Sequence, residues 1–155
     1  MRTNEHGITI IKKYEGLVDG DPETPGFDPY ICPAGYPTIG WGNTFDKNGD
    51  RVTMEHPPIS LEEAEGLFAQ EVEKVERQLT GLIRVSVNDN QFSALVSFVY
   101  NLGSGRFSGS TLRQRLNRGD YEGAANEFWK WRRAGGVILR GLVLRRASEA
   151  ALFRS

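Results

Sequence analysis

The feature that most constrains the fold is an unbroken helical pattern in the middle of the chain. Ser60 and Glu63 have the spacing of a capping box, and more acidic residues follow where the helix dipole favours negative charge. Apolar side chains then recur every three or four positions: Ala64, Phe68, Val72, Val75 and Leu79. We therefore predict one long helix that begins at Ser60 and ends near Gly81.

The residues before this helix have a different character. Helical spacing is found only from about Asn4 to Tyr14. Residues 19–29, DGDPETPGFDP, are almost all turn formers and acids, which predicts an irregular surface loop. Residues 31–44, ICPAGYPTIGWGNT, are typical of a strand, a turn and a second strand, and Asn48-Gly49 is a further turn signal. A small antiparallel sheet is expected here.

The residues after the long helix are predominantly helical. Asn88 and Gln91 open one helix, which Gly103 ends. Further helices are expected at residues 110–118, from Asp120 through Trp131, and at residues 142–153. The fold class is therefore α+β, with a small antiparallel sheet lobe that the long helix joins to a helical lobe. A cleft between the two lobes would be the natural place for a ligand.

Length and composition fit one soluble domain. The 155 residues, 39% of them hydrophobic, can form a single domain over 1–155. We place the sheet lobe at about 15–59, the linking helix at about 60–80, and the helical lobe at about 81–155 together with the N-terminal helix. A single cysteine excludes an internal disulfide. The N-terminus has no signal-peptide pattern and no run is apolar enough to span a membrane, so we expect synthesis in the cytosol.

The charge is divided unevenly along the chain. Residues 1–80 carry 7 basic and 15 acidic side chains, whereas residues 81–155 carry 12 basic and 5 acidic ones. Two interpretations stay open at this point. The halves attract each other, or the second half presents a basic face to a polyanion such as nucleic acid or a bacterial envelope.

Metal and phosphate sites find no support in the sequence. His6 and His56 are far apart, with no further ligand at a suitable spacing. The segment DKNGD, at 46–50, is a hairpin turn, because the positions after it lack the residues of a calcium loop. The segment GYPTIGWG, at 35–42, lacks the ending of a phosphate loop. We expect no metal and no cofactor.

Two side chains are candidates for chemistry. Glu15 ends an otherwise apolar helix, at the negative end of the helix dipole, which favours the protonated form that a general acid needs. An arginine of the last helix, Arg145 or Arg146, would oppose this effect if it reached the carboxyl group. Cys32 taken alone is expected to be a small buried hydrophobic residue, since a cysteine-protease site would need a converging histidine.

Five segments, in this order, together resemble one known family. They are YEGL at 14–17, CPAGYPTIGWGNT at 32–44, NQFSALVSFVYNLG at 90–103, STLRQRLNRGDYEGAANEFWKW at 110–131 and GLVLRRASEAALF at 141–153. The set resembles the phage-type lysozymes, the endolysins of glycoside hydrolase family twenty-four. The resemblance implies a lysozyme-like fold and hydrolysis of the β-1,4 bond between N-acetylmuramic acid and N-acetylglucosamine in peptidoglycan.

The resemblance also assigns roles to residues. It implies that Glu15 is the general acid, and that Cys32, with Thr38 after five intervening residues, positions or activates the attacking water. It implies that Arg145 or Arg146 pairs with Glu15. The chain departs from the family pattern in the sixteen residues between Glu15 and Cys32, where about eight are usual, and in an asparagine, Asn43, where many relatives have histidine.

The chemical role of Cys32 and the type of reaction stay open. An unperturbed thiol is mostly neutral at pH 7 and is then a poor base. A lytic transglycosylase that uses Glu15 alone, and a non-enzymatic cationic module, are the alternatives to hydrolysis.

Predictions of binding and location complete the interpretation. The residues expected to bind substrate are Tyr30, Trp41, Asn43, Tyr100 and Asn101. The expected partner is the peptidoglycan glycan strand, with no nucleic acid, no membrane insertion and a monomeric protein. The resemblance implies accumulation in the host cytoplasm and release to the cell wall with the help of a separate holin-type protein.

Overall fold

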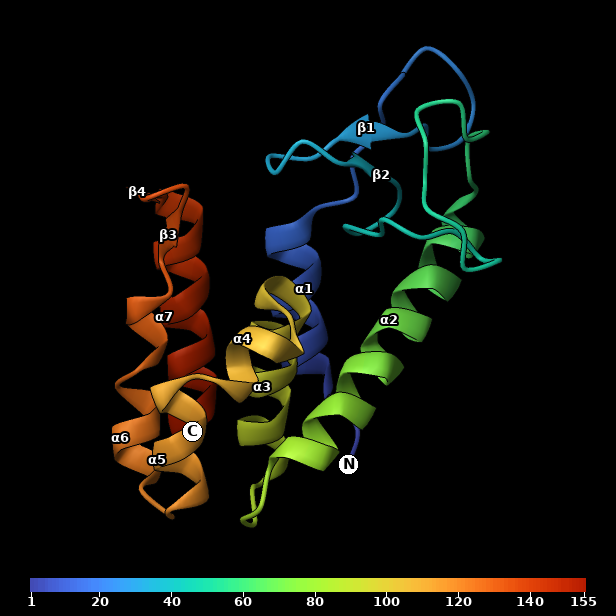
Figure 1. The fold of residues 1–155 in the computed structure, drawn as a ribbon. Coiled ribbons are helices and arrows are strands. Elements are labelled where there is room, and N and C mark those ends of the chain that lie inside the picture. The colour runs from blue at the N-terminus through green and yellow to red at the C-terminus, as the bar shows by residue number, and fades with distance from the viewer. The chain divides into compact units, whose positions relative to one another are not determined.

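The computed structural model describes all 155 residues, which form two compact units. Unit 1 comprises residues 1–14 and 72–155, and unit 2 comprises residues 15–71. The helix α2, Leu61–Leu82, is the long helix expected from the sequence, and it contributes residues to both units (Figure 1). None of the helices combines the length and the apolar character needed to cross a membrane.

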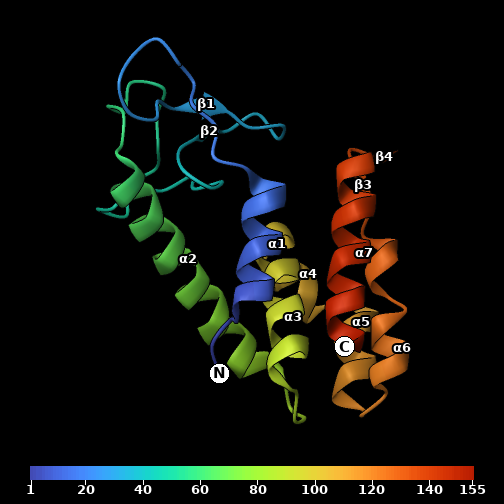
Figure 2. The same cartoon turned by 180° about the vertical axis from the view of Figure 1, so that it is seen from behind.

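Unit 1 is built from helices packed around α3, Asp89–Leu102. Its capping box is confirmed: the Gln91 backbone N–H donates to Asn88 Oδ1 at 2.7 Å, and the Asn88 N–H donates to Gln91 Oε1 at 2.9 Å. The other helices are α1 Glu5–Glu15, α4 Ser104–Ser108, α5 Thr111–Asn117, α6 Tyr121–Ala125 and α7 Arg140–Arg154. α3 packs on α7, and Figure 2 shows α6 beside α7.

Aromatic rings fill the centre of unit 1. The ring of Phe98 on α3 meets three others edge to face, with centroid distances of 6.3 Å to Phe107, 5.5 Å to Phe128 and 5.7 Å to Trp131. Edge-to-face contacts of this kind stabilise a core beyond the burial of apolar area. The apolar pattern of residues 92–102 is thus explained by packing.

The prediction of one helix from Asp120 through Trp131 is wrong, because the observed helix is shorter. Asp120 does cap a helix, since the Gly123 N–H donates to its Oδ1 at 2.9 Å, but α6 ends at Ala125. A 3-10 turn, Phe128–Lys130, follows, and then β3 Arg133–Ala134 pairs with β4 Val137–Ile138. Gly135 and Gly136 both have positive φ, so their turn favours a hairpin rather than a helix end.

Unit 2 carries the other two strands. β1, Tyr30–Ile31, pairs antiparallel with β2, Pro37–Thr38, as predicted, although the strands are short. The segments that flank the turn at Asn48-Gly49 form only one isolated β-bridge, between Phe45 and Arg51, so the pairing there is less extensive than predicted. The α+β fold class is confirmed.

Local hydrogen bonds order the acidic loop at 19–29, which contains no helix or strand, as expected. Asp19 Oδ1 accepts hydrogen bonds from the backbone N–H groups of Asp21 and Asp28, each at 3.0 Å. Asp28 Oδ2 accepts one from the Thr24 hydroxyl at 2.6 Å. Two of the loop's acidic side chains thus fix the loop itself.

Candidate active site

The hairpin of unit 2 presents three of the predicted residues on one face. Tyr30 on β1 lies directly opposite Thr38 on β2. Cys32 follows two positions after Tyr30, and its backbone N–H donates to the Tyr36 carbonyl at 3.0 Å, which continues the pairing. Because side chains alternate along a strand and directly opposed residues share a face, Tyr30, Cys32 and Thr38 project to the same side.

The turn between the strands favours an ionised Cys32. Burial raises the pKa of the thiol, but hydrogen bonds from the backbone of Tyr36, the Thr38 side chain and the backbones of Ala34 and Gly35 outweigh it. The pKa therefore lies below that of an ordinary cysteine. The side chain is half-buried, so the expectation of a buried hydrophobic residue is wrong.

Thr38 is held tightly beside the sulfur. The residue is 1% exposed, and its hydroxyl donates to the Tyr36 carbonyl oxygen at 2.8 Å. A threonine hydroxyl has one proton and two acceptor lone pairs. With its proton on the Tyr36 carbonyl, the Thr38 oxygen can accept a hydrogen bond, and a rotation of the hydroxyl would turn the proton to the Cys32 sulfur instead.

Glu15 lies at the end of α1, where Gly16 takes a positive φ of 69° and the helix stops. Its carboxylate lies against Gly42: a Cβ atom at that position would be 2.8 Å from Glu15 Oε2. Gly42 itself has a φ of 81°, a conformation that glycine adopts without strain. The absence of a side chain at Gly42 leaves the space that the carboxylate occupies.

Tyr30 connects the carboxylate with the hairpin. Burial raises the pKa of its hydroxyl, and the negative charges of Glu15 and then Cys32 raise it further, while a hydrogen bond from the Gly42 backbone acts in the opposite direction. The tyrosine hydroxyl is therefore within electrostatic reach of both groups. Unit 2 thus brings Glu15, Tyr30, Cys32 and Thr38 together.

Trp41 and Asn43 have packing roles in unit 2. Trp41 is 6% exposed and its ring lies 5.6 Å from that of Phe68, edge to face. Asn43 is 7% exposed, and its side-chain amide donates to the Leu67 carbonyl at 3.4 Å. Their contact with substrate stays a prediction that this burial argues against.

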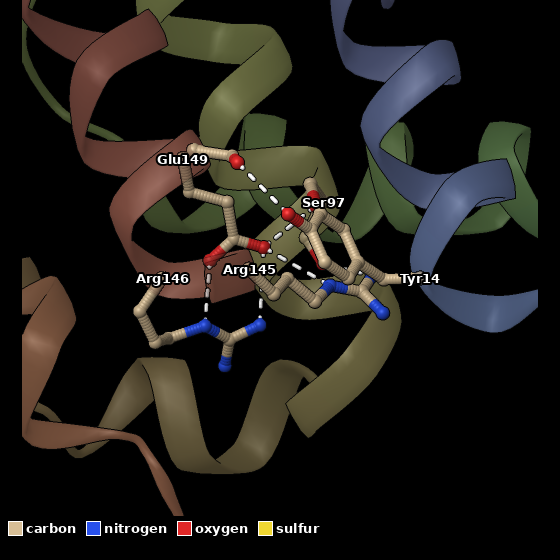
Figure 3. A network of polar contacts seen from close by, with 6 residues as sticks. Tyr14, Ser97, Arg145, Arg146 and Glu149 are labelled. Atoms are coloured by element: carbon tan, nitrogen blue, oxygen red, sulfur yellow. Dashed lines mark hydrogen bonds and ion pairs between the residues drawn. The ribbon is translucent and has the colours of Figure 1, made fainter. Parts of the chain in front are cut away.

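Arg145 and Arg146 lie on α7 in unit 1, where both bind Glu149 (Figure 3). The Glu149 Oε2 atom lies 3.3 Å from Arg145 Nε, and Oε1 lies 2.8 Å from Arg146 Nε. The Ser97 hydroxyl donates to Oε2 at 2.6 Å. Burial raises the pKa of the Glu149 carboxyl, and these partners oppose that rise. The pairing of either arginine with Glu15 stays a prediction.

Sequence analysis missed Glu149, although a signal was present. Arg146 and Arg145 precede it by three and four positions, the spacing at which helical side chains meet. The remaining predicted residues, Tyr100 and Asn101, lie near the end of α3, where the first is half-buried and the second is exposed.

No group of three or more histidine, cysteine or acidic side chains is arranged to hold a metal ion. His56 Nε2 lies 4.0 Å from Asp46 Oδ2, and no third such side chain completes a metal site there. Asp46 instead accepts backbone hydrogen bonds from Asn48 and Asp50 through Oδ1, which closes the predicted hairpin turn.

Comparison with known proteins gives consistent matches. A family model described as "Phage lysozyme" matches residues 22–149. The endolysin of Acyrthosiphon pisum secondary endosymbiont phage 1 is 38% identical over 160 residues, which cover 100% of this chain and 99% of that protein. The endolysin of Bacillus phage B103 is 41% identical over 99% of this chain but only 54% of its own length, so the chain spans about half of that relative.

Solved structures agree with the sequence matches. The endolysin from Escherichia coli O157:H7 phage FAHEc1 superposes with a TM-score of 0.83 at 33% sequence identity. The superposition covers 99% of this chain and 93% of that one.

Proposed function

The chain belongs to the phage lysozyme family, and from this premise we propose that Glu15, Cys32 and Thr38 carry out its reaction. The protein is a phage endolysin of the lysozyme type, a glycosidase whose substrate is peptidoglycan. The bond it cleaves is the β-1,4 bond between N-acetylmuramic acid and N-acetylglucosamine. The non-enzymatic binding module is not favoured by these matches.

Glu15 is the general acid of this proposal. It is the last residue of α1 and the first residue of unit 2, which also holds Cys32 and Thr38. In the reaction it gives its proton to the glycosidic oxygen as the bond to the anomeric carbon breaks. The carboxylate formed in this way lies against Gly42, which leaves room for it.

Cys32 and Thr38 bind the attacking water. The backbone hydrogen bonds that lower the pKa of Cys32 make its sulfur a better acceptor, and the Thr38 oxygen can accept a second hydrogen bond through a lone pair while its proton is on the Tyr36 carbonyl. A water that donates to both atoms turns a lone pair toward the anomeric carbon. As the water adds to that carbon, one of its protons passes to the thiolate. The single observation that carries this assignment is the set of hydrogen bonds around the Cys32 sulfur.

This arrangement supports hydrolysis over the transglycosylase alternative. A single-acid mechanism, in which a hydroxyl of the sugar attacks, needs no pair of hydrogen-bond acceptors for a water at the hairpin. Mass analysis of the glycan products separates the two, since hydrolysis yields reducing ends that carry an added water. Anhydro-muramic ends would overturn the proposal for Cys32 and Thr38 while leaving Glu15 as the acid.

The test of the acid is Glu15→Gln, matched with Glu55→Gln, an exposed acid of unit 2. We expect Glu15→Gln to lose lysis of purified peptidoglycan while its far-UV circular dichroism stays that of the parent protein. Glu55→Gln should keep full activity. Lysis by Glu15→Gln close to that of the parent protein would refute the assignment.

Three further points belong to the proposal. We place Arg145 or Arg146 beside Glu15, and Tyr100 and Asn101 along the bound glycan. The enzyme reaches its substrate from the host cytoplasm with the help of a separate holin-type protein. Expression in bacteria with and without an agent that permeabilises the cytoplasmic membrane tests the last point, and lysis without the agent would contradict it.

A further inference from the structure

The Tyr30 hydroxyl occupies a position in the site that packing alone does not require. It lies on the same face of the hairpin as Cys32, directly opposite Thr38 in the strand register. Its oxygen accepts a hydrogen bond from the Gly42 backbone, and Gly42 is also the residue against which the Glu15 carboxylate lies. The hydroxyl is thus anchored at the point where Glu15 and the hairpin meet.

The hydrogen bond from the Gly42 backbone limits which groups the Tyr30 hydroxyl can donate to. A phenolic oxygen that accepts from a backbone N–H keeps its own proton for another acceptor. The groups whose negative charge acts on this hydroxyl are Glu15 and, more weakly, Cys32. The proton is therefore available to the region of Glu15 and Cys32, where negative charge develops during the reaction.

We propose that Tyr30 is a positioning residue of the reaction, whose hydroxyl offsets the negative charge that develops on Glu15 when it gives up its proton. This inference rests on the proposed function. When Glu15 gives its proton to the leaving oxygen, a new negative charge forms on its carboxylate, within electrostatic reach of the Tyr30 hydroxyl. A hydrogen-bond donor near that charge stabilises the transition state more than the ground state, in which the proton has not yet left the acid.

The expected effect is on kcat. A hydrogen bond to a charged group contributes about 1.5–3 kcal/mol, which corresponds to a roughly ten- to hundredfold loss of kcat in Tyr30→Phe. KM for soluble glycan fragments should change by less than about twofold, because phenylalanine keeps the ring that would contact a sugar. This distinguishes the proposal from a role of Tyr30 in substrate binding alone, in which KM would rise and kcat would not change.

The pH dependence of kcat/KM provides a second test, because a purely structural role of Tyr30 would leave it unchanged. Loss of the hydroxyl removes a hydrogen-bond donor from a region of negative charge, so the kcat/KM profile should move to higher pH in Tyr30→Phe. Tyr30→3-fluorotyrosine keeps the hydroxyl and makes it a stronger donor, so its profile should move to lower pH. This second variant keeps the test valid if Tyr30→Phe is too unstable.

The matched control is Tyr121→Phe, which removes a hydroxyl that donates to the Ser86 carbonyl at 2.6 Å in unit 1. It should keep the kcat and the pH profile of the parent protein. A folded Tyr30→Phe with parental kcat and profile, or with a raised KM alone, would overturn the inference. Activity in Glu15→Gln would instead refute the proposed function, so the two failures can be told apart.

Discussion

The buried carboxylate of Glu149 offers the sharpest test of what stabilises unit 1. Glu149→Gln keeps the shape of the side chain and removes its charge. Glu149 is 0% exposed and lies between Arg145 and Arg146, with Ser97 as a third partner. In the variant, the amide nitrogen can only donate, so at least one guanidinium loses its acceptor and meets another donor.

The magnitude follows from the burial of this group. Removing one partner of a buried ion pair costs about 3–5 kcal/mol, because the remaining charge stays desolvated and uncompensated. For a chain of 155 residues with an unfolding entropy of about 2.1 cal/mol/K per residue, this loss lowers Tm by about 10–15 °C. A loss of that size is a large fraction of the roughly 5–15 kcal/mol by which natural domains are stable.

Urea unfolding followed by circular dichroism measures the change as a lower midpoint at an unchanged slope. The control is Glu122→Gln, which removes the same charge from an exposed pair with Arg154 at 3.5 Å. This exposed pair should contribute less than about 1 kcal/mol. If Glu149→Gln costs no more than the control, the reasoning about the buried network is refuted.

Three predictions concern the site itself. The rate at which iodoacetamide alkylates Cys32 should reach its half-maximum at a lower pH in the folded protein than in the urea-unfolded chain. The reason is that the hydrogen bonds that favour the thiolate are lost on unfolding. Equal midpoints in the two states would contradict this prediction. Cys32→Ala should lose considerably more lytic activity than Cys32→Asp, which keeps an ionised acceptor, and equal small losses would return Cys32 to a packing role. Gly42→Ala should destabilise the fold by about 1–2 kcal/mol, because Gly42 has a positive φ. The added methyl group should also displace the Glu15 carboxylate, so that kcat falls by up to roughly 100-fold. A parental kcat would show that the contact between Gly42 and Glu15 is not required.

The helices that were predicted well have local causes. The capping box of Asn88 and Gln91 joins residues three positions apart, and the apolar stripe of α2 follows the helical period directly. The segment after Asp120 shows the limit of this reasoning. Its composition suits a helix, but Phe128 packs on Phe98 from another part of the chain, and Glu127 pairs with Arg115 at 3.2 Å, so tertiary contacts replace the second half of the helix with a 3-10 turn.

What the sequence determined by itself was the fold class, the positions of most helices and the order of Glu15, Cys32 and Thr38, because periodicity, caps and motif spacing are properties of neighbouring residues. Only the tertiary structure decided that the pKa of Cys32 is lowered, since the directions of the surrounding N–H groups depend on the conformation of the turn. It also decided that Gly42 makes room for the Glu15 carboxylate, which lies far from it in the chain. Electrostatics and close packing depend on distances in space, and for this protein those distances arise only when the chain is folded.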